Sequence, residues 1–254
     1  MSHFRTGPAT AIAKVFCAGL LAVLLACPGM QVAQGRTVAS DPNPALRGQP
    51  YTLTARAREP ASPTDPNRKS ADFLGEPASD DVRRVAEWVV DAHDNLGLPF
   101  IIIDKVMARV FLFDAVGRLR GASPALLGLA RGDSTVPGIG DRRLSTIRPE
   151  ERTTPAGRFV ASLGHNTGHH DILWVDYANA ISLHRVVTSN PKERRLERLA
   201  AVSPAERRIS YGCINVPVAF YEGTVLPAFA GTTGIVYVLP ETRPLRSVFP
   251  SLPE

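Results

Sequence analysis

Short apolar runs recur through the second half of the chain, separated by glycine, proline or polar turns. The runs are rich in β-branched and aromatic residues, a pattern typical of β-strands. The predicted strands are residues 100–103, 109–113, 118–119, 157–163, 172–177, 180–184 and 234–239. Many short strands with this punctuation predict a mainly β domain, an antiparallel sandwich or barrel-like sheet with a few short helices.

Helical periodicity interrupts this pattern. Ser79 and the two acids after it resemble a helix start, and apolar residues then recur at helical spacing over residues 80–95, until Gly97 and Pro99 end the helix. Inside the β region, the charged stretch 193–200 is predicted to be helical. The stretch 216–229 is also predicted to be helical, because its early proline suits a first turn.

The first residues follow a third pattern. Arg5 and Lys14 precede an unbroken apolar run of 13 residues, 15–27, and no acid occurs before Asp41. Such a run is too short to cross a bilayer, which takes about 20 residues, and it fits the core of a secretory signal peptide. We therefore expect export to the periplasm or cell envelope.

Two cleavage sites are consistent with this pattern. Residues 33–35 offer the small residues of an ordinary signal peptidase site, whereas residues 24–27 resemble a lipoprotein box with an untypical leucine at its second position. In the second case Cys27 would be lipidated and would tether the chain to a membrane. Cleavage removes two of the 29 basic residues and none of the 24 acids, so the charge becomes 27 − 24 = +3. This mild basicity suits an anionic envelope and does not indicate nucleic-acid binding.

Composition completes the division of the chain. Residues 36–78 are rich in proline and poor in large apolar residues, which predicts an extended linker or wrapping arm. The predicted order is a signal peptide at 1–35, this arm, an N-terminal helix at 79–98, a β domain at 99–240 that is large enough to hold an active site, and a C-terminal tail at 241–254.

The candidate chemistry centres on one cysteine. Cys213 is the only cysteine outside the first 27 residues, so it has no intramolecular disulfide partner in the exported chain. Exported proteins usually pair their cysteines, and a free thiol there indicates a reactive group; an inert buried cysteine is the alternative. His184 ends a predicted strand upstream, and an imidazole beside a thiol can generate the thiolate nucleophile.

Three blocks, taken in order, resemble the catalytic domain of the L,D-transpeptidases, exported enzymes that cross-link peptidoglycan through a cysteine. Residues 109–114 with Gly117 resemble the opening hairpin, and residues 153–159 resemble the Thr-Pro-x-Gly-x-Phe signature. Residues 181–184 and 210–215 resemble the histidine and Ser-His-Gly-Cys elements. The resemblance covers about residues 100–240 and implies a transferase of peptidoglycan biosynthesis, acting in cell wall organization and cell shape, with no cofactor or metal.

The resemblance also implies roles. Cys213 would attack the third residue of a tetrapeptide stem and expel the terminal D-Ala, with His184 as general base and acid and the main-chain carbonyl of Arg185 orienting the imidazole. An amine would then resolve the thioester to give a cross-link. Carbapenems, which the family's donor site accepts, would acylate the same cysteine.

Other roles fall on the segment around the nucleophile. The backbone amides of Tyr211, Gly212 and Cys213 are candidate oxyanion donors, and Ser210 and Asn215 are candidate substrate-binding residues. Tyr211 departs from the family, which usually has a second histidine there. If that histidine mainly lines the pocket, tyrosine can replace it; if it transfers protons, turnover or specificity would change.

A second departure is length. His184 and Ser210 are separated by 25 residues, more than the family commonly has, and the excess within 187–208 is rich in arginine and lysine. It is interpreted as a basic lid that binds stem carboxylates or other anions, or as a solvated helix without a functional role.

Alternatives remain open at this stage. A hydrolase on the same scaffold, a cysteine L,D-carboxypeptidase or amidase, would share every motif, and a non-catalytic envelope-binding protein would retain only the fold. His165, His169, His170 and Asp171 could bind zinc, but their turn-like setting favours a loop beside the cleft that contacts substrate.

Overall fold

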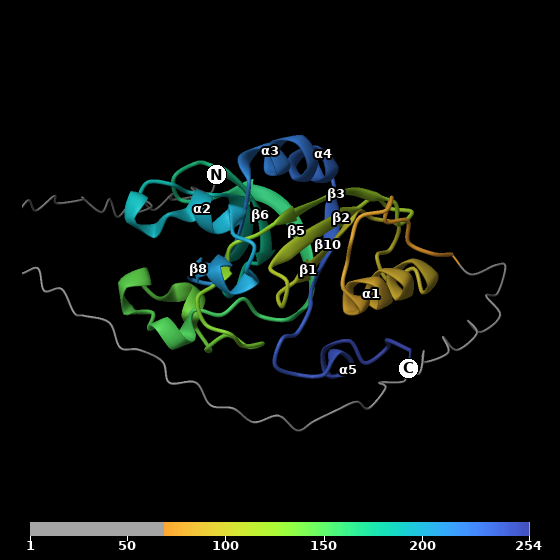
Figure 1. The fold of residues 1–254 in the computed structure, drawn as a ribbon, viewed down its shortest axis with the longest axis horizontal. Helices are drawn as coiled ribbons and strands as arrows, with labels where there is room; N and C mark the ends of the chain where they lie inside the picture. Colours follow the sequence, from red (N-terminus) through yellow and green to blue (C-terminus); the bar gives the residue numbers. More distant parts are fainter. Residues whose placement is uncertain (1–68, 254) are drawn as a thin grey trace, which may run out of the picture. The chain divides into compact units, whose positions relative to one another are not determined.

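The computed structural model describes residues 69–253, so the predicted signal peptide, Cys27 and most of the proline-rich arm lie outside the described residues. The described part contains an eight-stranded sheet of order β3-β2-β1-β10-β5-β6-β7-β9 (Figure 1). Its strands are β1 (Phe100–Asp104), β2 (Arg109–Phe113), β3 (Leu119–Pro124), β5 (Gly157–His165), β6 (Asp171–Asp176), β7 (Ile181–Arg185), β9 (Ile214–Val216) and β10 (Thr233–Val238). A smaller sheet pairs β4 (Leu127–Gly128) with β8 (Arg208–Ser210).

The large sheet is mostly antiparallel and nearly closes on itself. Only the β1–β10 and β7–β9 pairs within it are parallel. The chain just after β3 reaches the opposite edge, where the Leu126 N–H lies 2.8 Å from the Asn215 carbonyl oxygen and the Asn215 N–H lies 2.9 Å from the Leu126 carbonyl oxygen. The prediction of a mainly β, barrel-like domain is confirmed.

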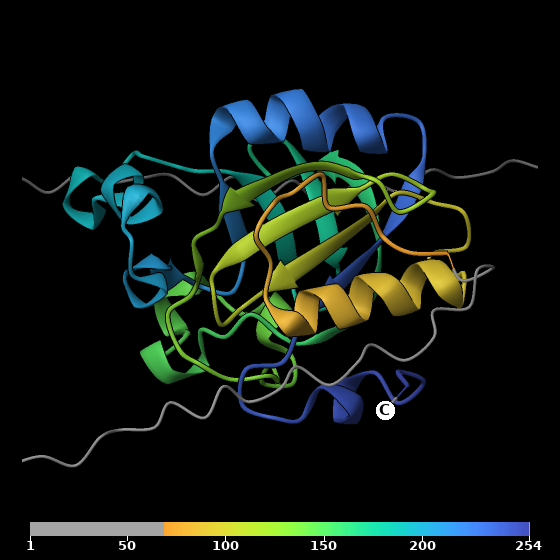
Figure 2. The ribbon, with the colours of Figure 1, turned by 45° about the vertical axis from the view of Figure 1, so that its right-hand side comes forward.

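β1 shows how the sheet is packed on both sides. Ile101 and Ile103 face the interior of the curled sheet, while Phe100 and Ile102 face a second apolar cluster. That second cluster contains the buried side of α1 (Asp80–Asp91), which lies across the front of the β1–β3 region (Figure 2). A strand buried on both faces carries a continuous apolar run, and the sequence of β1 has this form.

The remaining helices are short. α2 (Arg195–Ala200) lies in the long connection between β7 and β8, and α5 (Leu245–Val248) lies near the C-terminal end. Between β9 and β10, α3 (Val218–Phe220), the π-helical turn Tyr221–Val225 and α4 (Leu226–Phe229) form one continuous helical segment. The 3-10 turns are Ile139–Asp141, Leu144–Thr146, Pro149–Glu151, Pro191–Glu193 and Pro204–Arg207. No helix among residues 69–253 is long and apolar enough to cross a membrane.

Several predicted boundaries are corrected by local contacts. The first helix ends at Asp91 rather than near residue 95, because His93 adopts a left-handed φ of 53° and the Asn95 amide bonds the carbonyls at residues 98 and 115. Val216 belongs to β9, so the helix after it begins at Val218. The charged helix begins at 195 instead of 193, because a 3-10 turn precedes it.

The C-terminal segment is packed on the domain. Leu245, Phe249 and Leu252 are buried in the same cluster as α1. Beside them, the fully buried ammonium of Lys105 lies 2.7 Å from Asp133 Oδ1 and 3.8 Å from a Glu241 carboxylate oxygen. These contacts tie the end of β1, the loop after β4 and the start of the C-terminal segment together.

Candidate active site around Cys213

Parallel pairing of β7 and β9 brings the two candidate catalytic groups together. The register places His184 opposite Asn215, and Cys213 directly precedes β9. His184 and Cys213 are both partly buried, so the pair lies at the surface of the domain with limited access to solvent. The sheet therefore fixes a thiol and an imidazole that are far apart in the sequence.

The imidazole of His184 has a defined orientation. Its Nδ1 lies 2.7 Å from the carbonyl oxygen of Arg185, and because a carbonyl only accepts, Nδ1 carries the proton. The side chain of Arg185 is anchored by Asp171 at 3.1 Å and Glu222 at 2.9 Å, and its guanidinium lies 4.4 Å from the ring centroid of Tyr221. These contacts hold the Arg185 carbonyl in place. Because that carbonyl engages Nδ1, the ring nitrogen left to face the Cys213 thiol is Nε2.

The thiol and imidazole alter each other's acidity. Burial alone would raise the pKa of the Cys213 thiol, but its hydrogen bond with His184 and the charge of the imidazole outweigh burial and lower that pKa. Burial likewise would lower the pKa of His184, but the contact of His184 with Cys213 and its hydrogen bond to the Arg185 carbonyl outweigh burial and raise that pKa. Both changes favour the thiolate–imidazolium pair that nucleophilic cysteines use.

Two further groups contact the sulfur. The hydroxyl of Ser182 and the carbonyl oxygen of Ala180 each lie 3.6 Å from Cys213 Sγ. The Ser182 hydroxyl contributes to the lowered pKa of the thiol by donating a hydrogen bond to it. Ser182 lies two residues before His184 on β7, so both side chains project from the same face of that strand, toward the Cys213 sulfur.

Ser210 and Asn215 are turned inward. Ser210 is 3 % exposed; its hydroxyl accepts from the Gly212 N–H at 3.1 Å and donates to the Cys213 carbonyl at 2.6 Å. Asn215 is 1 % exposed. Hydrogen bonds within the site engage both side chains, and their expected substrate-binding role stays a prediction.

Thr154 sets the direction of the peptide bond before the nucleophile. Its hydroxyl donates to the Gly212 carbonyl at 2.8 Å and accepts from the Gly128 N–H at 2.9 Å. In a planar trans peptide the N–H points opposite to the carbonyl, so the Cys213 N–H points away from Thr154. The Gly212 N–H is engaged with the Ser210 hydroxyl. The amides of Tyr211, Gly212 and Cys213 stay predicted oxyanion donors.

Glycine is required at position 212. Its φ of 131° lies outside the usual range of L-residues, and a Cβ there would lie 2.6 Å from the Thr153 carbonyl oxygen and 2.8 Å from Ile181 Cδ1. The sharp turn that exposes Cys213 therefore depends on the absence of a side chain.

The ring of Tyr211 is covered by an arginine. The Arg152 guanidinium lies 4.0 Å from the ring centroid, and the same guanidinium donates to the Ile147 carbonyl at 3.0 and 3.2 Å. This stacking fixes the ring of Tyr211. His184 stays the predicted proton-transfer partner of Cys213, and the effect of Tyr211 on turnover stays a prediction.

The long connection after β7 reaches the site through one side chain. Arg195, on α2, donates to Asn215 Oδ1 at 2.6 Å, and Asn215 Nδ2 lies 3.3 Å from His184 Nε2. Leu199 of the same helix is buried against Leu126 and its neighbours. The segment is thus packed against the domain beside His184; its action as a lid stays a prediction.

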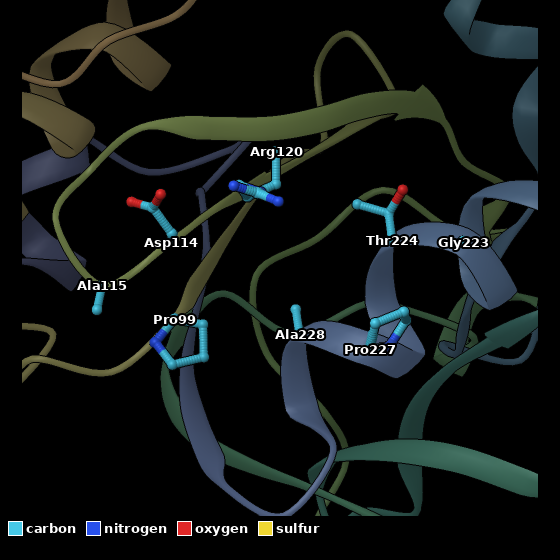
Figure 3. A pocket seen from close by; sticks show the side chains of 8 residues that line it. All are labelled: Pro99, Asp114, Ala115, Arg120, Gly223, Thr224, Pro227 and Ala228. Carbon is cyan, nitrogen blue, oxygen red and sulfur yellow. The ribbon is translucent and has the colours of Figure 1, made fainter.

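The described domain has hollows both beside the site and away from it. One, of about 440 Å³, is lined by His184, Asp171, His170 and Asn166, so the histidine-containing hairpin borders the site. Another, of about 370 Å³, lies between the β2–β3 hairpin and α4; Figure 3 shows Arg120 and Asp114 on its hairpin side. It contains none of the predicted site residues. Among residues 69–253, no group of three or more His, Cys, Asp or Glu side chains converges to hold a metal ion.

Comparisons with known proteins give limited information. No protein-family model matches the sequence, and no curated protein matches it. The structure is similar to a solved structure described as LD transpeptidase LdtMt1 in complex with imipenem, with a TM-score of 0.31 and 14 % sequence identity. The match covers 56 % of this chain and 58 % of that chain. A similarity this low does not indicate an activity, so the functional proposal rests on the geometry of the site.

Proposed function

We propose that this protein is a peptidoglycan L,D-transpeptidase that transfers an acyl group through Cys213. The observation that carries the proposal is the coupling of Cys213 to a histidine whose other nitrogen is tied to the Arg185 carbonyl at 2.7 Å. A merely structural cysteine needs neither a lowered pKa nor an oriented imidazole. The three sequence blocks that resemble L,D-transpeptidases select the reaction among those a cysteine can perform.

The geometry accounts for the first half of the reaction. The Cys213 thiolate attacks the carbonyl of the third stem residue, and the Cys213 N–H, turned away from Thr154, is directed to stabilise the developing oxyanion. The imidazolium of His184 then gives its Nε2 proton to the departing amine of the terminal D-Ala. A thioester and free D-Ala result.

The second half reverses the proton movement. His184, now neutral, removes a proton from an incoming amine as that amine attacks the thioester carbonyl. The sulfur leaves as thiolate and recovers the ion pair with the imidazolium, and the product is a cross-linked stem. If water replaces the amine, the same steps trim the stem, which is the hydrolase alternative.

The setting is proposed from the N-terminal pattern. Peptidoglycan lies outside the cytoplasmic membrane, and an exported chain with residues 1–35 as signal peptide would meet it in the periplasm or cell envelope. Carbapenems would acylate Cys213 in the same way as the stem, because they offer a strained carbonyl to the thiolate.

Intact mass after incubation with a tetrapeptide-stem muropeptide tests the proposal, beside a Cys213→Ala variant and with chromatography of the products. A Cys213-dependent acyl adduct with cross-linked dimers is expected. An adduct with tripeptide products alone would identify a hydrolase. Neither adduct nor product, from protein that still reacts with a thiol reagent, would refute both enzymes and leave the envelope-binding alternative.

A further inference from the structure

The arginine that reaches the site from the long connection has no role in the reaction described above. Arg195 is 13 % exposed, and its Nη1 lies 2.6 Å from Asn215 Oδ1 while its Nε lies 2.5 Å from a Glu193 carboxylate oxygen. Both ends of its guanidinium are therefore engaged. The contact with Asn215 crosses from the connection into the sheet, and Asn215 itself touches His184.

The arginine decides which end of the asparagine amide faces the histidine. A guanidinium only donates hydrogen bonds, so the atom of Asn215 beside Arg195 must be its oxygen. The amide nitrogen then faces His184 Nε2 at 3.3 Å and the Cys213 carbonyl at 3.4 Å. The backbone of Asn215 is paired with Leu126 on one side and with β7 on the other, so only the amide orientation is left to be set.

This orientation has a consequence for the proton on His184. Neutral His184 has a lone pair at Nε2, because Nδ1 holds its proton against the Arg185 carbonyl. An amide N–H can donate to that lone pair, but it opposes an Nε2 that already carries a proton. The positive charge of Arg195 acts in the same direction.

We propose that Arg195 is a positioning residue of the Cys213–His184 pair: it fixes the Asn215 amide so that its nitrogen faces His184, and so favours the neutral imidazole against the imidazolium that Cys213 favours. The inference rests on the proposed function for its catalytic meaning. Once Cys213 is acylated, no thiolate is left to hold the imidazolium, and the Arg195–Asn215 contact keeps His184 ready to take a proton from the acceptor.

The other charged groups beside His184 do not account for the favouring of its neutral imidazole. Asp171 and His170 border the hollow beside it, but the Asp171 carboxylate is engaged with Arg185 at 3.1 Å. The Glu193 carboxylate contacts Arg195 Nε and partly offsets the positive charge of that arginine. Glu193 and Arg195 should therefore act on His184 in opposite directions.

The test is an NMR titration of the His184 ring in the full exported chain without substrate, assigned with a His184→Ala variant. Arg195→Gln should move the titration of His184 to higher pH, and Arg195→Lys, which still donates a cationic hydrogen bond, should largely restore it. Arg198→Gln is the matched control, because Arg198 lies on the same helix and its guanidinium bonds the backbone carbonyls of residues 193 and 206 instead of Asn215.

A second variant, for which the titration of His184 should shift in the opposite direction, keeps the test decisive if Arg195→Gln does not fold. Glu193→Gln removes the acid that offsets Arg195, so His184 should titrate at lower pH. Equal titration of His184 in wild type, Arg195→Gln and Glu193→Gln would overturn the proposal. If Arg195→Gln fails to fold by circular dichroism, Glu193→Gln alone decides. Because no substrate is present, a failure of muropeptide turnover would refute the proposed function and leave this result standing.

Discussion

The acidity of the Cys213 thiol depends on its contact with His184. The contact lowers the pKa of the thiol despite its burial, so the thiolate should persist at pH values below those of a free cysteine and be lost as pH falls through the lowered value. We expect iodoacetamide to alkylate Cys213 with a pH profile shifted to the acid side. His184→Ala should move the profile to pH values at or above those of an ordinary thiol, because the imidazole no longer opposes the rise in the Cys213 pKa that burial causes.

The control for this profile is Ser182→Ala. Ser182 also donates to the sulfur at 3.6 Å, but it is a weaker contributor than the imidazole and should shift the profile less. An unchanged profile in His184→Ala would show that the thiolate does not depend on the imidazole.

Thr154 acts on the nucleophile through one hydrogen bond. Thr154→Val keeps the shape of the side chain but removes the donor to the Gly212 carbonyl at 2.8 Å, so the Cys213 N–H loses its fixed direction. We expect acylation of Cys213 by a muropeptide or carbapenem to slow roughly 10²-fold, the usual cost of one oxyanion donor. Alkylation by iodoacetamide, which forms no oxyanion, should change little; equal losses in both reactions would contradict this role.

At the scale of elements, most strands with five or more residues could be predicted because their apolar runs are long enough to show a pattern. β3 is the exception: its sequence, LRGASP, has no apolar run, and only residues 118–119 are predicted there. β4, β8 and β9 have two or three residues each and carry no periodicity, so they were missed. Yet β9 is the strand that brings Asn215 beside His184. Cys213 and His184 could be named as candidates from residue type. The contacts of Thr154 with Gly212 and of Arg195 with Asn215 join segments far apart in the chain, which spacing along the sequence does not reveal.

Three elements meet at the buried Lys105, and this cluster should make a large contribution to stability. Its ammonium lies 2.7 Å from Asp133 Oδ1 and 2.9 Å from the Thr154 carbonyl oxygen, and it balances two buried acids together with Arg208. Lys105→Met leaves Asp133 and Glu241 short of one cation, which typically costs about 3–5 kcal/mol for a buried pair. Urea unfolding measures this loss.

An exposed ion pair provides the comparison. Arg118 and Asp72 are 4.0 Å apart and more than half exposed, so Arg118→Met should cost at most about 1 kcal/mol. Similar losses in the two variants would mean that the Lys105 cluster is not stabilising through its charges.

At the scale of the whole domain, residues 69–253 should unfold as one unit because the C-terminal segment completes a core shared with α1 and β10. Phe249 is 2 % exposed, and its ring centroid lies 6.2 Å from that of Trp88 and 6.1 Å from that of Tyr237. Phe249→Ala should therefore lower the free energy of unfolding by about 3–5 kcal/mol. Urea unfolding followed by tryptophan fluorescence and circular dichroism should still give coincident transitions.

The same variant separates stability from chemistry. Phe249 and the Cys213–His184 pair belong to different parts of the sheet. Phe249 packs with Phe100 of β1 and Tyr237 of β10, whereas the pair lies at β7 and β9, and β5 and β6 separate the two regions. Under conditions where Phe249→Ala is folded, Cys213 should be alkylated at the wild-type rate. A two-step unfolding curve, with the main transition unchanged, would instead show that the C-terminal segment is an independent appendage. An altered alkylation rate would show that the β1–β10 region and the β7–β9 region are coupled through the sheet.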